Sequence, residues 1–174
     1  AVVFMFENLM VDARAKGLGT VPTVFQSFVE DEFRALLYLP PEVEARVTSP
    51  WLARKDADWG IDRLYGFAAG LGATVVHTAI SRTVIDVNRD PAGVSLYPGQ
   101  TTTGLCPTET FDGEPLYREG QAPTARDLAD RRDRYFEPYH AALASELTRL
   151  LALQPRVVLY DCHSIRSVIP RLFD

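Results

Sequence analysis

The sequence predicts an α/β fold, in which a mixed sheet is flanked by helices. Apolar runs rich in β-branched residues indicate buried strands, and segments with apolar residues every three or four positions indicate helices. The two kinds of segment alternate along the chain, which is typical of a largely parallel or mixed sheet covered by helices. With 174 residues, 47% of them hydrophobic, the chain is long enough to bury one core.

Residues 1–39 fit this pattern poorly. Residues 1–6 form an apolar run, and residues 25–39 could form a helix with its apolar residues on one side. Neither stretch carries recognisable chemistry. We therefore divide the chain into an atypical N-terminal segment, 1–39, and a domain, 40–174.

Two helices are expected at the start of the domain. Pro41 can stand in the first turn of a short helix over 41–47, where a backbone N–H has no partner in any case. Asp58 can cap a second helix that runs to Ala69 and ends at Gly70.

Three apolar stretches predict buried strands, namely 73–80, 84–87 and 157–164. The second and third of them end abruptly in polar residues. Enzymes with α/β folds place their chemistry at such strand ends, because a rigid sheet holds the groups there. We expect the two polar clusters to form one site.

A long connection separates these two strands. Residues 90–123 are rich in Pro, Gly and Thr, and a loop of this length in a compact domain is usually functional, so we expect it to cover the site. Thr124 and Asp127 then form a capping box, with Asp in place of the usual Glu, and open a helix that reaches about residue 153. Pro138 should kink or split that helix.

Composition excludes several classes of protein. A net charge of −5 argues against a general nucleic-acid binder, which needs a basic face. No run approaches the roughly 18 apolar residues that cross a bilayer. Two cysteines, Cys106 and Cys162, are too few for a disulfide scaffold and fit a reducing compartment. We expect a cytoplasmic protein without nucleic-acid or membrane partners. The sequence does not determine its oligomeric state.

His163 lies in the polar end of the last predicted strand segment. A neutral imidazole there is a natural Zn²⁺ ligand, and Asp161 or Ser164 could fix its tautomer. The alternative is a partly buried structural histidine bonded to backbone. Cys162 does not act as a nucleophile with His163 as its base, because adjacent side chains on an extended chain point to opposite faces.

Arg82, Asn88 and Arg89 lie around the other strand end. Guanidinium groups bind carboxylates through paired, charge-assisted hydrogen bonds, so these donors suit a substrate with one or two carboxylates. The alternative is structural, with Arg82 or Arg89 paired to Asp86 or Asp90 to hold the long loop.

Two acidic residues, Asp56 and Asp58, precede the helix predicted at 58–69. One could ligate a metal while the other caps the helix, or both could be capping acids. The sequence leaves open which of them would be the ligand. The basic run 131–134 is interpreted as a solvated helix face, and His77 and His140 as structural residues.

Four segments carry a resemblance to a known family. They are SRTVIDVNRDP (81–91), SLYPGQTTTGLCPTETFDGEPLY (95–117), RRDRYFEPYHAAL (131–143) and VVLYDCHSIRSVIPRLFD (157–174). Over about residues 40–174 the chain resembles the N-formylglutamate amidohydrolase (N-formylglutamate deformylase) family of histidine degradation. The long loop matches in order and spacing, which makes the resemblance specific.

The resemblance implies a fold like that of zinc carboxypeptidases, with one Zn²⁺ or another divalent metal at the strand ends. It implies hydrolysis of N-formyl-L-glutamate to formate and L-glutamate. His163 corresponds to a metal-ligand histidine, and Asp56 is the best match to the acidic ligand. Arg82, Asn88 and Arg89 would hold the carboxylates of the substrate.

The chain also departs from the family pattern. Residues 33–39 contain no histidine where the family has a metal ligand, and Gly60 stands where related sequences often carry His. The general-base glutamate of the family is expected beyond Asp174. We therefore expect a partial domain with impaired catalysis, or alternatively a non-catalytic fragment that keeps only a carboxylate-binding surface or a structural role.

Overall fold

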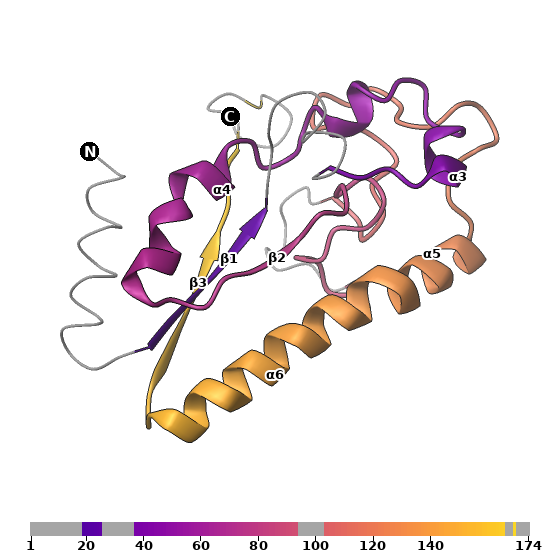
Figure 1. Cartoon of the computed structure of the whole chain (residues 1–174). Coiled ribbons are helices and arrows are strands. Elements are labelled where there is room, and N and C mark those ends of the chain that lie inside the picture. Colours follow the sequence, from indigo (N-terminus) through magenta and orange to yellow (C-terminus); the bar gives the residue numbers. More distant parts are fainter. Residues whose placement is uncertain (1–18, 26–36, 94–102, 166–168, 170–174) are drawn as a thin grey trace.

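The chain forms a three-stranded parallel sheet with helices on both sides. The computed structural model describes residues 19–25, 37–93, 103–165 and 169. Its strands are β1 (Gly19–Phe25), β2 (Val76–Thr78) and β3 (Val157–Cys162), in the order β2-β1-β3. Figure 1 shows α4 (Ile61–Leu64) and α6 (Glu137–Leu153) on opposite sides of the strands. The predicted α/β class is confirmed.

Both strand pairings are parallel. Gly19 to Val24 of β1 pair with Val157 to Cys162 of β3, and Thr23 to Phe25 pair with Val76 to Thr78 of β2. The sheet is small, and no antiparallel strand occurs among the described residues, so the mixed sheet that we expected is not seen in this part of the chain. The predicted strand at 73–80 shortens to β2, and the one at 157–164 is β3.

The first helices differ from their predicted lengths. The helix α3 (Pro41–Glu44) has its proline in the first turn, as predicted. The helix expected over 58–69 is instead α4, which is followed by the 3₁₀ segment η2 (Gly66–Leu71). Asp58 does not cap it, because its carboxylate accepts a hydrogen bond from the Ser164 amide at 2.7 Å. Gly60 stands at the N-cap instead, with a φ of 74° that favours glycine.

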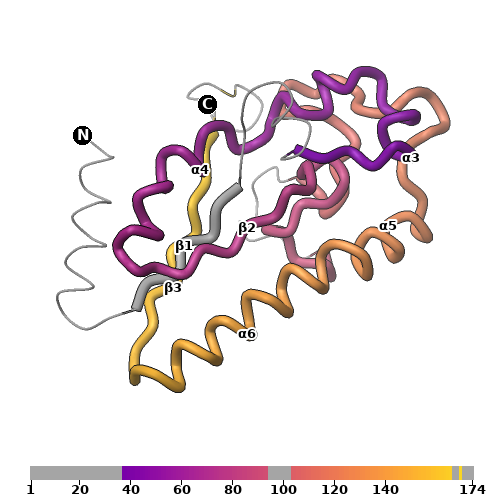
Figure 2. The backbone as a smooth tube through the Cα atoms, in the orientation of Figure 1, coloured from indigo at the N-terminus to yellow at the C-terminus, as the bar shows by residue number. Residues whose placement is uncertain are grey.

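The long helix keeps its predicted limits but changes its internal geometry. Thr124 and Asp127 form the predicted capping box ahead of α5 (Ala125–Arg131). A π-helical turn, η3 (Arg132–Phe136), then leads into α6, and Figure 2 traces the three as one path. Pro138 lacks an amide hydrogen and its ring would crowd the carbonyl of Arg134, so a widened turn precedes it and the helix continues.

The predicted strand at 84–87 is wrong. The backbone forms turns there, and the Val84 amide donates to the Ser81 carbonyl at 2.9 Å. Val84, Ile85 and Val87 are nevertheless at most 2% exposed. The apolar pattern of residues 84–87 therefore reflects their burial among other elements and not pairing into a sheet. The helix predicted over 25–39 falls mostly outside the described residues, and Phe25 itself belongs to β1.

The core forms around this buried loop and the helices. One cluster joins α3, the loop and the long connection, through Leu39, Val43, Val47, Ala53, Val84, Leu116 and Tyr117. A second joins the loop to the long helix, through Ile85, Val87, Cys106 and Phe136. Arg131 is only 5% exposed, so interpreting 131–134 as a solvated face is wrong for its first residue. None of the helices in the described residues is long and apolar enough to cross a membrane.

Candidate active site

The end of β3 turns Cys162 into the core and His163 toward the surface. Cys162 is 1% exposed, whereas about a third of the His163 side chain is exposed, as expected for neighbours on an extended chain. The Nε2 atom of His163 lies 2.7 Å from Oδ2 of Asp161, and its Nδ1 atom lies 3.7 Å from Oδ2 of Asp58. Burial acts to lower the pKa of His163, but the hydrogen bonds and charges of Asp161 and Asp58 outweigh it and raise the pKa to about 10.

Ser164 fastens this strand end to the segment before α4. Its amide donates to Oδ1 of Asp58 at 2.7 Å, and its hydroxyl donates to the Trp59 carbonyl at 3.2 Å. These two bonds join residues more than a hundred positions apart in the sequence. They hold the Asp58 carboxylate beside the imidazole of His163.

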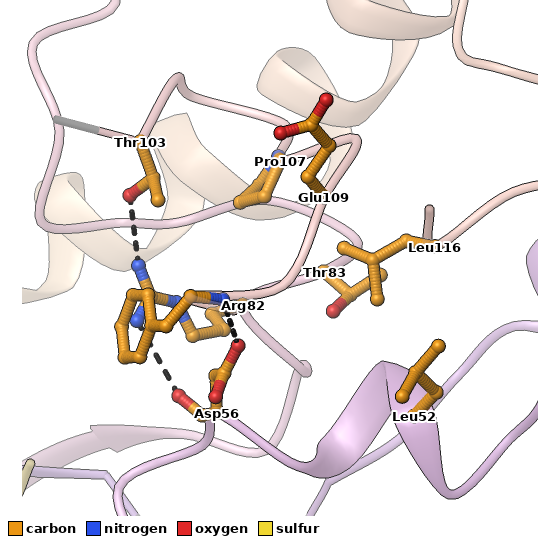
Figure 3. Close-up of a pocket in the computed structure, with 9 residues that line it drawn as sticks. Leu52, Asp56, Arg82, Thr83, Thr103, Pro107, Glu109 and Leu116 are labelled. Atoms are coloured by element: carbon orange, nitrogen blue, oxygen red, sulfur yellow. Dashed lines mark hydrogen bonds between the residues drawn. The ribbon is translucent and has the colours of Figure 1, made fainter. Parts of the chain in front are cut away.

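The structure gives the two candidate acidic ligands different surroundings. Asp58 lies beside His163, whereas Oδ2 of Asp56 accepts a hydrogen bond from the Phe111 amide at 2.6 Å. The backbone carbonyl of Asp56 accepts from Nη1 of Arg82 at 3.3 Å, as Figure 3 shows. The geometry therefore favours Asp58 over Asp56 as the carboxylate that acts together with His163.

Two of the predicted carboxylate-binding residues surround one aspartate. Nη2 of Arg82 lies 2.7 Å from Oδ2 of Asp86, and Nε of Arg89 lies 3.7 Å from the same oxygen. Thr103 accepts from both arginines, through its hydroxyl from Arg82 at 3.0 Å and through its carbonyl from Arg89 at 3.1 Å. The structural pairing with Asp86 is thus present, with two guanidinium groups facing one carboxylate.

Asn88 connects this arginine cluster to the end of β3. Its backbone amide donates to Oδ1 of Asp86 at 3.1 Å, and its side-chain Nδ2 lies 3.1 Å from Nε2 of His163. The two polar clusters predicted from separate segments therefore meet in one place. The structure brings Asn88 and His163 into direct contact. Arg82 and Arg89 are linked to Asn88 through Asp86, which all three contact.

A small depression lies on the Arg82 side of the site. It encloses about 230 Å³, part of it open solvent, between Asp56, Arg82, Thr103, Glu109 and Phe111. The Arg82 guanidinium carbon lies 4.6 Å from the centre of the Phe111 ring. Part of the long loop therefore lines this depression.

Sequence reasoning missed Thr103 as the shared acceptor of both arginines. The run of three threonines at 101–103 was the available signal, but it could not say which of them faces the cluster. Sequence reasoning also missed the roles of Arg131 and His140, whose side chains bond to backbone carbonyls. Such bonds leave no pattern in the sequence, because any residue can supply the carbonyl.

The residues present suit a divalent metal only in part. One imidazole and one carboxylate are typical Zn²⁺ ligands, and a separation of 3.7 Å between Nδ1 of His163 and Oδ2 of Asp58 allows both atoms to reach one ion. A bound ion would replace the proton on Nδ1, and Asp161, bonded to Nε2, would then fix the tautomer. The described part of the chain contains no group of three or more His, Cys, Asp or Glu side chains arranged to hold a metal.

Comparison with known proteins points to a single family. A model of the N-formylglutamate amidohydrolase family matches residues 35–174. The N-formylglutamate deformylase of Pseudomonas aeruginosa is 46% identical over 136 residues, which cover 78% of this chain and 51% of that protein. The corresponding enzyme of Pseudomonas putida is 48% identical over 119 residues, covering 68% and 44%.

Two crystal structures resemble the fold. One is an N-formylglutamate amidohydrolase from Ralstonia eutropha, with a TM-score of 0.55, 25% identity, and coverage of 85% of this chain and 53% of that one. The other is a gene product of Agrobacterium tumefaciens, with a TM-score of 0.56 and 19% identity over 90% and 55%. At 19% identity, the second supports the fold alone.

The chain spans about half the length of the curated relatives that it matches. The matching region nevertheless includes the arginine cluster, the long loop, the long helix and the end of β3, all within residues 35–174. This chain belongs to the N-formylglutamate amidohydrolase family.

Proposed function

We propose that the chain carries part of a metal-dependent active site that hydrolyses N-formyl-L-glutamate to formate and L-glutamate, a step of histidine degradation. The contact between Asn88 and His163 at 3.1 Å is the observation on which this proposal depends. It joins a cluster suited to carboxylates with a histidine suited to a metal, and a substrate with two carboxylates and one formyl group needs both. The names of the relatives support the same reaction.

The arginine cluster would bind the substrate carboxylates. Arg82 and Arg89 share Asp86, so the cluster attracts an anion, and the Arg82 side chain is only 16% exposed, where charge-assisted bonds are weakly screened. Phe111 packs against the guanidinium of Arg82 and fixes its plane. Asn88 would add an amide donor between the carboxylate subsite and His163.

His163 and Asp58 would hold the metal, which we take to be Zn²⁺ or another divalent ion. Such an ion, when bound, polarises a carbonyl oxygen and lowers the pKa of its bound water. Asp161 would keep the His163 ring in the tautomer that offers Nδ1, and Ser164 would hold Asp58 in place. We further propose that β2-β1-β3 belongs to a larger, zinc-carboxypeptidase-like sheet, which the parallel strand order supports.

The test combines metal content with product release. The purified protein is loaded with zinc, dialysed and assayed for bound zinc and for formate released from N-formyl-L-glutamate. His163→Ala is expected to abolish both, and Asp58→Asn to lower bound zinc more than Asp56→Asn does. His77→Ala is the matched control, because His77 is an exposed strand histidine outside the site. Equal zinc content in His163→Ala and His77→Ala would contradict the assignment.

A second candidate function is carboxylate binding without catalysis. The observation that favours it is that Arg82, Arg89, Asp86 and Thr103 are assembled within the described residues, whereas no complete metal site is. Titration with L-glutamate distinguishes the two. Glutamate binding that Arg89→Ala weakens, in a protein that holds no zinc and releases no formate, would establish the binding function in place of the enzyme.

A further inference from the structure

The long helix holds the loop that carries the candidate substrate-binding residues. Nη1 of Arg131 donates to the carbonyl of Val84 at 2.9 Å, and Nε2 of His140 lies 2.9 Å from the carbonyl of Val87. A carbonyl oxygen only accepts, so Nε2 of His140 carries the proton. The two carbonyls lie between Arg82 and Asn88 in the sequence. The helix therefore fixes the backbone on both sides of Asp86.

A third bond reinforces this arrangement. The Tyr117 hydroxyl donates to the carbonyl of Thr83 at 3.1 Å and accepts from Nη1 of Arg131 at 3.0 Å. Arg131 and Tyr117 are 5% and 6% exposed, and at such positions hydrogen bonds are little weakened by water. Three carbonyls of a loop without sheet pairing are thus satisfied by side chains from two other segments.

The π-helical turn gives Arg131 and His140 their common direction. The two residues lie nine positions apart, and at about 100° per residue an α-helix would turn them to nearly opposite faces. A π turn accommodates one extra residue, so the separation equals eight α-helical positions, or about 80°. Both side chains can then point toward the same loop.

The ring of His140 is also fixed by its neighbours. Its centroid lies 4.2 Å from that of Phe136 and 5.2 Å from that of Tyr139, which stands edge-on to it. Phe136 packs in the same cluster as Ile85 and Val87. The imidazole is therefore held between the helix and the loop, with Nε2 directed at the Val87 carbonyl, one residue before Asn88.

We propose that His140, together with Arg131, is a positioning residue that sets where Asn88, Arg82 and Arg89 stand relative to His163. The kinetic part of this inference rests on the proposed function, because it concerns how substrate carboxylates reach their donors. The structural part does not. It states that Asn88 meets His163 only when the helix holds the Val87 carbonyl.

Two substitutions separate the hydrogen bond from the packing. His140→Phe keeps an aromatic ring between Phe136 and Tyr139 but removes the donor to the Val87 carbonyl. His140→Gln keeps an N–H donor at a similar reach but removes the ring. Arg132→Gln is the control on the same helix, because Arg132 is about half exposed and pairs with Glu137 at the surface.

Three measurements are made on each protein: the KM for N-formyl-L-glutamate, the affinity for L-glutamate, and the NMR signals of the Asn88 carboxamide and the His163 ring. His140→Phe is expected to raise KM and weaken glutamate binding on the order of ten-fold to a hundred-fold, because a small displacement of positioning groups has effects of that size. It should also shift both NMR signals. His140→Gln should restore most of each property, and Arg132→Gln should change none.

Each outcome decides the proposal. If His140→Phe lowers only the melting temperature, with KM, glutamate affinity and both signals unchanged, His140 is a packing residue and the proposal is overturned. If the unsubstituted protein neither releases formate nor binds glutamate, the proposed function fails by itself. The NMR signals then decide the positioning role alone, because a shift in His140→Phe that His140→Gln reverses supports it and unchanged signals refute it.

Discussion

The end of β3 and the loop over residues 81–89 carry the two halves of the candidate site, but they are built in different ways. The β3 backbone is positioned by a ladder of bonds to β1, in a register that runs from Val157 to Cys162. The loop has no such ladder, and its carbonyls at Thr83, Val84 and Val87 accept from side chains of Tyr117, Arg131 and His140.

The sequence predicts a buried strand for both segments, and each segment meets one half of that prediction. Leu159 of β3 is 47% exposed, whereas Val84 and Ile85 of the loop are at most 1% exposed. An apolar, β-branched run therefore does not by itself distinguish a buried loop from a partly exposed strand, because strand preference largely reflects packing. Core contacts hold the loop in place. The loop can therefore position site residues as the end of a strand does.

The largest effect should come from removing the shared carboxylate of the loop. The Asp86 side chain is 8% exposed and accepts from Arg82 and from the Asn88 amide, with Arg89 close by. Asp86→Ala should lower the free energy of unfolding by about 3 kcal/mol, because it leaves two partly buried cations facing each other. Urea denaturation measures this, with Asp130→Ala as the control at an exposed carboxylate on α5. Equal losses in the two variants would show that the arginines do not depend on Asp86.

A matched pair of truncations compares the loop with the strand directly. Ile85→Ala should cost about 2.5 kcal/mol of unfolding free energy, since it opens a cavity among Val87, Cys106 and Phe136. Leu159→Ala in β3 should cost less than about 1 kcal/mol, because nearly half of its side chain is already in water. The two unfolding curves measured under the same conditions give the comparison. A larger loss for Leu159→Ala would mean that an interface absent from the described residues covers β3.

A smaller effect than those of Asp86→Ala and Ile85→Ala concerns the start of the helix that holds the loop. Asp127 accepts from both terminal nitrogens of Arg46, at 2.9 and 3.2 Å, and from the Thr124 amide. The guanidinium of Arg46, with the amide and hydroxyl of Thr124, holds the pKa of Asp127 well below its ordinary value. Asp127→Asn should therefore lower the unfolding free energy by about 1 kcal/mol at neutral pH.

The pH dependence of this difference follows from the sign of the shift. An acid whose pKa is lowered in the folded state contributes its stabilisation above its unfolded pKa of about 4, and loses it as the pH falls further. The difference between the protein and Asp127→Asn should therefore be constant from pH 7 to about 5 and shrink toward pH 2. Unfolding free energies across this range test it, and a difference that grew on acidification would contradict the assigned direction.

The sequence alone determined the local features of this protein. Proline in the first turn of α3, the Thr124–Asp127 capping box and the end of β3 just before His163 all depend on residues close together in the chain, so their physics can be read from a short window. The motifs also led to the family, because the long loop matched in order and spacing.

Only the tertiary structure decided which residues meet. Asp58 lies beside His163 because the Ser164 amide holds it there, and residues 84–87 remain a loop because the long helix satisfies their carbonyls. Both outcomes depend on bonds between side chains and distant backbone groups. Every residue offers the same backbone groups, so such bonds have no signature in the sequence, and only the folded arrangement selects among them.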